Sequence, residues 1–375
     1  MGEIRQTTDV ESMAPSRKKE RWMLITGGAG FIGTNLAHRI LSEGRPVLIL
    51  DNLSRPGVEK NLNWLCDTHG DLVRVEVADI CDSSAMDRAV TQADAVFHFA
   101  AQVAVTTSID NPLLDFDVNV QGTFNLLESI RRRNNRPPLV FTSTNKVYGK
   151  LGNLKLIQGA RRYEPADGRL RESGINENFP LDFRSPYGCS KGAADQYVLD
   201  YSRIYRIPAT VFRMSCIYGP HQFGTEDQGW VAHFLIQALS GKPIVLYGDG
   251  CQVRDILFVE DLVDALLTAR EYIGRIAGEA FNIGGGAGNV VSLMELIDYI
   301  TELGGKRPEV QSAEWRTEDQ KYYVSDITKF RAMTGWLPAV STREGIRSLW
   351  NWLSGALLFA NENPAARETM ARPLN

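Results

Sequence analysis

The stretch Thr26-Gly27-Gly28-Ala29-Gly30-Phe31-Ile32-Gly33 decides the fold of this 375-residue chain. It completes a short apolar run, residues 23–26, that has the character of a β-strand. Gly27, Gly30 and Gly33 stand at G-x-x-G-x-x-G spacing. The first glycine of such a loop allows a tight turn, the second lets the backbone approach a pyrophosphate, and the third lets the next helix pack close to the strand. The pattern therefore predicts a dinucleotide-binding loop.

A helix is predicted to follow this loop, over residues 35–43, with Gly44 ending it. The N-terminus of such a helix carries a positive dipole end and backbone N–H donors, which suit phosphate oxygens. The predicted cofactor contacts therefore include Phe31 and Ile32 as well as the three glycines.

An acidic residue stands where a dinucleotide needs one. The apolar run 47–50 predicts a second strand, which ends at Asp51, about twenty residues after the glycine loop. A carboxylate there accepts hydrogen bonds from the adenosine ribose hydroxyls and repels a 2′-phosphate. Asp51, with the adjacent Asn52, therefore favours NAD over NADP. Arg55 could serve a phosphate instead, but it lies further along the chain, and the alternative for Asp51 is a simple turn residue.

Three further strands are predicted, over residues 73–79, 95–102 and 139–144. Ligands of open α/β sheets collect at the carboxyl ends of strands, so residues near these ends are candidate cofactor contacts. We expect His98, inside an apolar run, to be a hydrogen-bonded core residue and not a ligand. The candidates are Asp79, Ile80, Ala100, Ala101, Gln102 and Asn119.

Thr144, Tyr187 and Lys191 form the candidate catalytic group. Lys191 follows Tyr187 at a spacing that places both side chains on one face of a helix. A free tyrosine has a pKa of about 10, but an adjacent ammonium favours the phenolate and lowers that pKa. The hydroxyl of Thr144 can hold a substrate alcohol beside Tyr187. These groups suit the removal of an O–H proton while the geminal hydrogen leaves as hydride to a nicotinamide.

Composition excludes several classes of function. The chain has 41 basic and 45 acidic residues, and no basic stripe that would suit nucleic acid. No apolar stretch approaches the roughly twenty residues of a membrane span, and the first twenty residues lack the apolar core of a signal peptide. The histidines are scattered, so no metal site is predicted. Five cysteines without a C-x-x-C pair indicate reduced thiols and a cytoplasmic protein.

Strand and helix signals alternate from residue 23 to about residue 213, which is typical of an α/β protein with a Rossmann-type, doubly wound parallel sheet. We expect a flexible tail at 1–20, an NAD-binding domain at 21–213, and a smaller mixed α/β substrate-binding lobe at 214–358, with segments returning to the first domain. Residues 359–375 are predicted to be a second tail. The polar stretch 149–186 is long enough to predict a lid or a partner surface.

With these motifs the chain resembles the extended short-chain dehydrogenase/reductases, the superfamily of nucleotide-sugar epimerases and dehydratases. The resemblance runs from about residue 22 to residue 338. It is carried by the glycine loop, by Ser143-Thr144-Asn145-Lys146-Val147-Tyr148-Gly149, by Tyr187-Gly188-Cys189-Ser190-Lys191, by Val253-Arg254-Asp255 and by Gly335-Trp336-Leu337-Pro338.

A narrower resemblance is to the CDP-paratose 2-epimerase family. It is carried by residues 101–112, 143–149, 185–197 and 227–231. It implies that NAD is held tightly while C2 of a nucleotide-linked hexose is oxidised, and that hydride then returns to the opposite face. Tyr187 would be the base, Lys191 would tune its pKa and Thr144 would hold the hydroxyl. Two departures from the family pattern, Met214 and the pair Pro220-His221, fall where the nucleotide-sugar is expected.

The predicted nucleotide-diphospho-sugar contacts include two arginines, Arg254 and Arg316, as pyrophosphate partners; a surface or interdomain ion pair is their alternative role. The full group is Thr144, Asn145, Lys146, Ser215, Gln228, Arg254 and Arg316.

Three other functions stay open at this point. A UDP-sugar C4-epimerase would use the same three catalytic residues. A non-catalytic NAD-binding sensor typically lacks the Tyr or the Lys, and net dehydrogenation would need release of the reduced cofactor. Dehydration is disfavoured, because Asn145 and Lys146 stand where the dehydratases carry an acidic pair. The resemblance also implies a homodimer or homotetramer that pairs through helices including residues 113–131 and 191–206.

Overall fold

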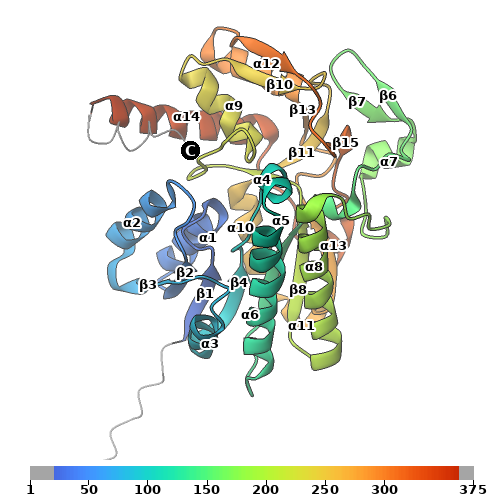
Figure 1. Cartoon of the computed structure of the whole chain (residues 1–375). Helices are drawn as coiled ribbons and strands as arrows, with labels where there is room; N and C mark the ends of the chain where they lie inside the picture. Colours follow the sequence, from blue (N-terminus) through green and yellow to red (C-terminus); the bar gives the residue numbers. More distant parts are fainter. Residues whose placement is uncertain (1–20, 363–375) are drawn as a thin grey trace, which may run out of the picture.

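The computed structural model describes residues 21–362 of the chain (Figure 1). Its centre is a sheet of seven strands in the order β12-β8-β5-β4-β1-β2-β3, and all six pairings between them are parallel. The order reverses between β1 and β4, which is the switch point of a Rossmann-type sheet. The predicted fold class is confirmed. The strands are β1 (Trp22–Thr26), β2 (Val47–Asp51), β3 (Val73–Val77), β4 (Ala93–His98), β5 (Leu139–Thr144), β8 (Ala209–Met214) and β12 (Ala280–Ile283).

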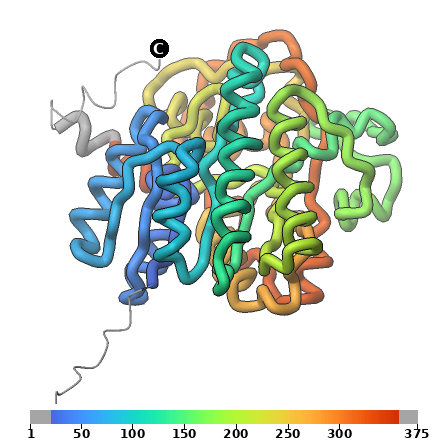
Figure 2. Tube along the Cα trace, turned by 60° about the horizontal axis from the view of Figure 1, so that its bottom comes forward, coloured from blue at the N-terminus to red at the C-terminus, as the bar shows by residue number. Residues whose placement is uncertain are grey.

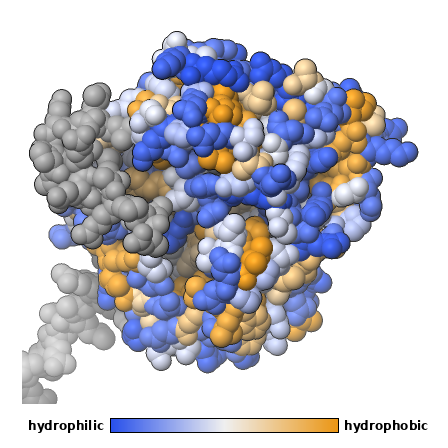
Figure 3. Space-filling model, turned by 45° about the horizontal axis from the view of Figure 1, so that its top comes forward, coloured by the Kyte–Doolittle hydropathy of each residue, from blue (hydrophilic) through white to orange (hydrophobic). Residues whose placement is uncertain are grey.

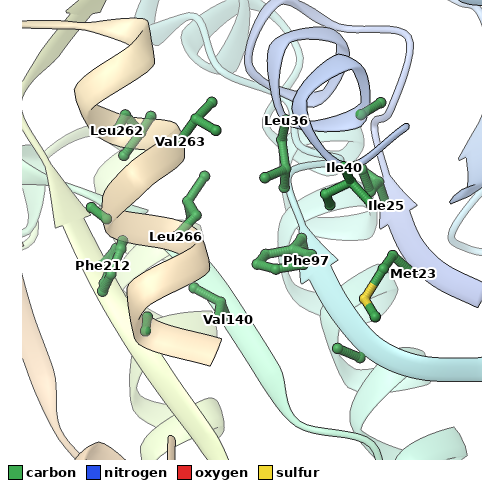
Figure 4. Packing of buried hydrophobic residues seen from close by; sticks show 14 of the residues in the cluster. Met23, Ile25, Leu36, Ile40, Phe97, Val140, Phe212, Leu262, Val263 and Leu266 are labelled. Carbon is green, nitrogen blue, oxygen red and sulfur yellow. The ribbon is translucent and has the colours of Figure 1, made fainter. Parts of the chain in front are cut away.

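Helices cover both faces of this sheet because successive residues of each strand point to opposite faces. Ile25 of β1 packs in one core with residues of α1 and α10, whereas its neighbour Leu24 packs in another with residues of α3, α6 and α8. Figure 4 shows the first core, where α1 and α10 lie on the same face of the sheet and direct apolar side chains toward each other. The helices are α1 (Phe31–Ser42), α2 (Val58–His69), α3 (Ser83–Gln92), α6 (Gly122–Arg131), α8 (Ser185–Tyr205), α10 (Val259–Glu271), α11 (Ile273–Ile276) and α13 (Thr328–Thr334).

Short helical segments connect these elements; η1 leads into the amino end of β3, and the others follow the carboxyl ends of β4 and β5. One of them, η2, is a π-helical turn between α5 and α6, a feature that often marks functional sites. The segments are η1 (Gly70–Leu72), α4 (Val105–Asp110), α5 (Pro112–Phe116), η2 (Asp117–Gln121) and η3 (Asn145–Tyr148).

A smaller lobe lies above the carboxyl edge of the sheet in Figure 1 and has its own apolar core. The second half of the chain also contributes to the domain built around the large sheet. Strand β12 pairs with β8, and helix α10 packs against α1. Figure 3 turns the top of the molecule, where this lobe lies, toward the reader, and most of the coloured surface there is hydrophilic. The lobe contains β9 (Cys216–Tyr218), α9 (Trp230–Leu239), β10 (Ile244–Tyr247), β11 (Val253–Phe258), β13 (Val290–Ser292), α12 (Leu293–Gly304), β14 (Val310–Ala313), β15 (Tyr322–Tyr323) and α14 (Thr342–Glu362).

The stretch 149–186 carries an antiparallel pair, β6 (Leu156–Gln158) with β7 (Tyr163–Pro165), followed by α7 (Gly168–Ser173). It projects at the side of the molecule in Figures 1 and 2. Arg162 ties it to the second lobe, because its guanidinium donates two hydrogen bonds of 2.7 Å to Glu295 on α12. The hairpin is therefore anchored in this structure.

Some element boundaries differ from the sequence prediction. Helix α1 begins at Phe31, not at residue 35, and the strands β3 and β4 end at Val77 and His98. The predicted tail at 1–20 lies outside the described residues; the predicted start of the second tail, residue 359, falls within α14. His98 is a buried core residue, as predicted, with its ring nitrogens 2.6 Å and 3.1 Å from the hydroxyls of Thr26 and Thr123.

The five cysteines are all unpaired. Within residues 21–362, no helix is both long enough and apolar enough to cross a membrane.

Candidate active site

The glycine loop between β1 and α1 is packed too tightly for side chains at two of its glycines. Gly27 has φ of 67°, and a Cβ added there would lie 2.6 Å from the backbone nitrogen of Ala100. A Cβ at Gly33 would lie 2.4 Å from the carbonyl oxygen of Gly27. Gly30 caps α1 without any side-chain hydrogen bond to the first turn. The N–H groups of Phe31 and Ile32 thus open a helix N-terminus that fits a pyrophosphate.

We expect Gly33→Ala to lower the affinity for NAD and the melting temperature, because the methyl group can be accommodated only if the loop shifts. Overpacking of this kind costs about 1–3 kcal/mol. Thermal unfolding with and without added NAD measures both effects. Gly274→Ala is the matched control, since a Cβ there meets nothing within 4 Å and its φ is not in the left-handed region. Equal melting temperatures for the two variants would contradict the expectation.

Asp51 lies at the end of β2, next to the glycine loop. Its two carboxylate oxygens accept hydrogen bonds from the backbone nitrogens of Ala29, at 3.0 Å, and Leu53, at 2.9 Å. Burial raises the pKa of this carboxyl, and the two backbone hydrogen bonds oppose the rise. Each oxygen keeps a free lone pair, so the side chain is oriented and can still accept from a ribose hydroxyl.

Asn52 and Asp79 bring the ends of β2 and β3 together, with the Asn52 amide donating to Asp79 at 2.8 Å. Burial alone would raise the pKa of Asp79, but hydrogen bonds from the Cys81 backbone and from Asn52 hold it below its usual range. The next residue, Ile80, is buried and would meet any Cβ at Gly122 of α6. The predicted cofactor contacts Asn52, Asp79 and Ile80 therefore lie close together beyond the ends of β2 and β3.

The turn after β4 holds Ala100, Ala101 and Gln102 against the glycine loop. Asn119, on the π-helical turn η2, fixes this segment: its Oδ1 accepts from the Gln102 nitrogen and its Nδ2 lies near the Gln102 oxygen, both at 3.0 Å. The same Nδ2 lies 3.0 Å from the hydroxyl of Ser190 on α8. Asn119 is almost fully buried, and it joins the turn after β4 to helix α8.

Thr144, Tyr187 and Lys191 come together at the carboxyl edge of the sheet. Thr144 ends β5, and Tyr187 and Lys191 lie on the first turns of α8. All three are buried, and a hydrogen bond links the side chains of Tyr187 and Thr144. The Lys191 ammonium donates to the carbonyl oxygen of Thr142 at 2.7 Å and lies 4.4 Å from the centre of the Phe141 ring.

The expected lowering of the Tyr187 pKa by Lys191 is not found in this structure. Burial raises the pKa of Tyr187 to about 12, the hydrogen bond from Thr144 opposes this, and the charge of Asp115 adds to it. Burial also lowers the pKa of Lys191 to about 8. Without ligands the phenol is thus protonated at neutral pH, because the desolvation of both groups outweighs their proximity.

Beside these residues a cavity of about 340 Å³ separates the sheet from the second lobe. Thr144 and Tyr187 adjoin its wall, which Asn145 and Ser185 help to form. Five of the predicted substrate contacts line it: Asn145, Lys146, Gln228, Arg254 and Arg316. Three residues of the stretch 149–186 line the cavity, namely Gly149, Arg184 and Ser185, and they stand at the two ends of the stretch, away from the hairpin of β6 and β7.

Ser215 was a predicted substrate contact, but it does not line the cavity, whereas the adjacent Cys216 does. The Ser215 hydroxyl hydrogen-bonds the carboxylate of Asp255 instead. Consecutive residues of extended backbone point to opposite sides, so only one of the two can face the cavity. The departures from the family pattern, Met214 and Pro220-His221, are also absent from its wall; Pro220 and His221 accept hydrogen bonds from Asn35 and Asn61.

The cations of the cavity are paired with carboxylates. Arg254 donates to Asp319 at 2.8 Å, and the ammonium of Lys146 lies 3.6 Å from the same oxygen. Arg316 lies 3.4 Å from Asp227, with its guanidinium 4.2 Å from the centre of the Tyr247 ring. Gln228 contacts the side chain of Arg55, which comes from the loop after β2. The cavity therefore presents cations suited to a diphosphate, and two of them, Arg254 and Lys146, share the single carboxylate of Asp319.

Several cavity residues were not predicted. Trp230 and His233 of α9, Tyr247 and Asp319 all line the wall. Trp230 stands inside the string 227–231 used for the family resemblance, so a signal for it existed. Asp319 lies 65 residues beyond its partner Arg254 in the chain, in a loop without any motif, and only the fold reveals the pair.

Comparisons with known proteins agree with this site. Residues 23–284, more than half of the chain, match the NAD dependent epimerase/dehydratase family. The chain is 43% identical to the CDP-paratose 2-epimerase of Salmonella typhi, over 88% of this chain and 99% of that protein. It is 32% identical to a putative UDP-glucose 4-epimerase of Methanocaldococcus jannaschii, over 88% and 98% of the two chains.

Solved structures show the same architecture. The UDP-glucose 4-epimerase of Thermus thermophilus in complex with NAD superposes with a TM-score of 0.75 at 32% identity, covering 89% of this chain and 99% of that one. The UDP-glucose 4-epimerase of Thermotoga maritima with UDP-glucose gives 0.76 at 30% identity, with the same coverage. With its glycine loop, Asp51 and the three catalytic candidates in place, this chain belongs to the NAD dependent epimerase/dehydratase family, and its cofactor is NAD.

Proposed function

We propose that this protein is a nucleotide-diphospho-sugar epimerase of the CDP-paratose 2-epimerase type, which inverts C2 of a nucleotide-linked hexose. The observation that carries the proposal is the convergence of Thr144, Tyr187 and Lys191 beside a cavity lined by Arg254 and Arg316. The 43% identity to a CDP-paratose 2-epimerase over nearly its full length supports the choice of reaction.

Each of these residues has its own role in substrate binding or proton transfer. Arg254, Lys146 and Arg316 bind the diphosphate and exchange their carboxylate partners for phosphate oxygens. Thr144 holds the reacting hydroxyl against Tyr187, which takes its proton and returns it after the sugar has turned. Bound NAD supplies the hydride acceptor, and, once reduced, the hydride donor. Lys191 stabilises the phenolate by its charge.

Tyr187 must lose its proton more easily in the loaded enzyme than in this structure, where its pKa is about 12. Binding of the positively charged oxidised nicotinamide and closer approach of the Lys191 ammonium would both act in that direction. We therefore assign the role of catalytic base to Tyr187 only in the ligand-bound enzyme.

Inversion at C4 is the second candidate, since UDP-glucose 4-epimerases superpose over almost the whole chain. Incubation of the purified protein with CDP-hexoses and UDP-hexoses, followed by proton NMR, distinguishes the two. A change confined to the couplings of H2 with its neighbours would support inversion at C2, whereas a change confined to the couplings of H4 would remove the proposal. Loss of the H2 signal without inversion would indicate net dehydrogenation, and bound NAD in the purified protein would speak against it.

We further propose that the protein forms a homodimer or homotetramer in the cytoplasm. Large apolar side chains are exposed on α4, α5 and α8, and a second copy of the chain is the partner that such a surface fits. The five unpaired cysteines suit a reducing compartment. Light scattering after size exclusion gives the molar mass, and a monomer at micromolar concentration would end the assembly proposal. The exposed residues are Ile109, Leu113, Leu114, Phe116 and Ile204.

A further inference from the structure

Gln252 is a buried residue of the cavity wall that the mechanism above does not use. It directly precedes β11 and lines the cavity, although only 2% of the residue is exposed. Its amide nitrogen Nε2 donates a hydrogen bond of 2.5 Å to the carbonyl oxygen of Tyr247. Within residues 21–362, its amide oxygen Oε1 has no hydrogen-bond partner. A buried acceptor without a donor costs free energy, so its position requires an explanation.

The orientation of the Gln252 amide is fixed by its neighbour. A backbone carbonyl oxygen can only accept a hydrogen bond, so the amide nitrogen must face Tyr247 and the amide oxygen must face away from it. Rotation of the amide by half a turn would set two acceptors against each other. Gln252 therefore offers an acceptor, and because it is a wall residue, the cavity is the side from which an O–H or N–H donor can approach it.

Gln252 stands beside the diphosphate cation Arg254. Both residues line the cavity, whereas Val253 between them packs in an apolar core. Side chains two residues apart in extended backbone share a side and are separated by about 7 Å. The guanidinium of Arg254 stays close to its own strand, because Nη1 donates to the Val253 carbonyl oxygen at 2.8 Å. The free acceptor is therefore about one strand repeat away from the cation.

The catalytic groups lie on the other side of Arg254. Lys146, which shares Asp319 with Arg254, belongs to η3, directly after the catalytic Thr144. Gln252 is instead joined to Tyr247 of β10, in the second lobe. A nucleotide-sugar with its diphosphate on Arg254 and its hexose beside Thr144 thus directs its nucleoside towards Gln252.

The wall around Gln252 separates the ribose from the base. Val245 lies two residues before Tyr247 on β10, and Leu293 follows Ser292, which pairs with Val253. Both apolar side chains line the cavity and suit the faces of a base. The ribose is the part of the nucleoside that is bonded directly to the diphosphate, so it comes first after Arg254. Its hydroxyls are donors, which is what the free oxygen requires.

We propose that Gln252 is a specificity-determining residue, whose Oε1 accepts a hydrogen bond from a ribose hydroxyl of the nucleotide-sugar. The inference rests on the proposed function, because it takes the diphosphate to bind Arg254. It is independent of the base, since cytidine and uridine carry the same ribose. It adds to the cations of the cavity a neutral group that reads the sugar of the nucleoside.

The test compares nucleoside diphosphates that differ in one hydroxyl. Isothermal titration of the NAD-bound protein gives the dissociation constants of CDP, 2′-deoxy-CDP and 3′-deoxy-CDP. The analogue that lacks the hydroxyl bound by Gln252 is expected to bind about tenfold more weakly than CDP, because it leaves the buried oxygen without a donor. The corresponding three UDP ligands should show the same loss. Equal affinity within each series would overturn the proposal, and absence of binding by both CDP and UDP would remove it together with the proposed function.

Replacement of Gln252 separates its contribution from that of other ribose contacts. Gln252→Met keeps the length of the side chain and removes the amide. The ratio of the two dissociation constants, deoxy analogue to CDP, should fall from about ten to about one, as in a double-mutant cycle. A purely structural role, through the lost contact with the Tyr247 carbonyl, would weaken all ligands by one factor and keep the ratio, which would contradict the proposal. Gln252→Leu serves for the same comparison if Gln252→Met does not fold.

A contact with the base gives a different pattern. In that case Gln252→Met would change the ratio of the CDP and UDP dissociation constants and leave the deoxy ratios as they are, and the ribose assignment would be wrong. The matched control is Gln311→Met, at an exposed position of β14 in the same lobe, which should keep every ratio within about twofold. If the ribose ratios behave as expected but no sugar is epimerised, the proposed function fails and the assignment of Gln252 stands.

Discussion

Tyr187→Phe is expected to lower kcat for epimerisation by about 10²–10⁴-fold while leaving NAD bound, because it removes the only proton acceptor assigned to the reacting hydroxyl. The loss should fall on kcat more than on KM, since the diphosphate contacts with Arg254 and Arg316 remain. Steady-state kinetics by coupled NMR or chromatography measures both constants, and the absorbance of released cofactor after denaturation gives the NAD content.

Tyr197→Phe serves as the control for Tyr187→Phe. Tyr197 lies on the same helix, α8, but is 44% exposed, and we expect its replacement to change kcat by less than about twofold. If Tyr187→Phe kept more than a tenth of the parent kcat, Tyr187 would not be the base. If Tyr187→Phe also lost its NAD, the residue would be needed for cofactor binding, and a fall in kcat would not identify the base. Thr144→Val would then be measured in the same two ways, for kcat and for NAD content.

The largest effect on stability is expected from Arg213→Met. The guanidinium of Arg213 is 5% exposed and makes its two hydrogen bonds to the fully buried Asp195, with a third to the hydroxyl of Tyr148 at 3.2 Å. Removal of one member of a buried ion pair leaves the other charge uncompensated, which costs about 3–5 kcal/mol of the free energy of unfolding. Urea unfolding measures the change as a fall in the transition midpoint.

Two further variants separate charge from packing at this pair. In the double variant with Asp195→Leu, the uncompensated charge is gone, and most of the lost stability should return. Arg343→Met, which breaks the exposed pair with Glu302 at 60% and 57% side-chain exposure, is expected to leave the urea transition midpoint almost unchanged, because solvent screens exposed ion pairs. A similar cost for the buried and the exposed variant would contradict the assignment.

The cofactor half of the site could be read from the chain because its signals are local. A glycine loop, a helix start and a strand-end acid occur in a fixed order, and each has a backbone requirement that a residue type meets. At Gly33 the requirement is steric, because an added Cβ would clash with the carbonyl oxygen of Gly27. The catalytic candidates Thr144, Tyr187 and Lys191 were likewise chosen from helical spacing and acid–base chemistry, before the family resemblance gave each of them the same role.

The substrate half was read less completely because its residues meet only after folding. The sequence analysis chose Ser215, whereas Cys216 lines the cavity. Adjacent residues of extended backbone point to opposite sides, and the sequence does not tell which of the two faces the cavity. Ser185, before Pro186, opens the catalytic helix with φ of 64°, a strained conformation that no propensity indicates. Asp319 was missed because nothing in the loop around it marks a partner for Arg254.

The sequence itself indicated the doubly wound sheet, the NAD loop and the candidate catalytic side chains, because residue spacing within one strand, loop or helix sets which groups share a face. The protonation of those side chains was decided only by the tertiary structure. Burial raises the pKa of Tyr187 and lowers that of Lys191, and Asp115, whose charge raises the pKa of both, lies on a different helix, α5. Desolvation and charge depend on what surrounds a group in space, and that information is absent from the linear chain until it is packed.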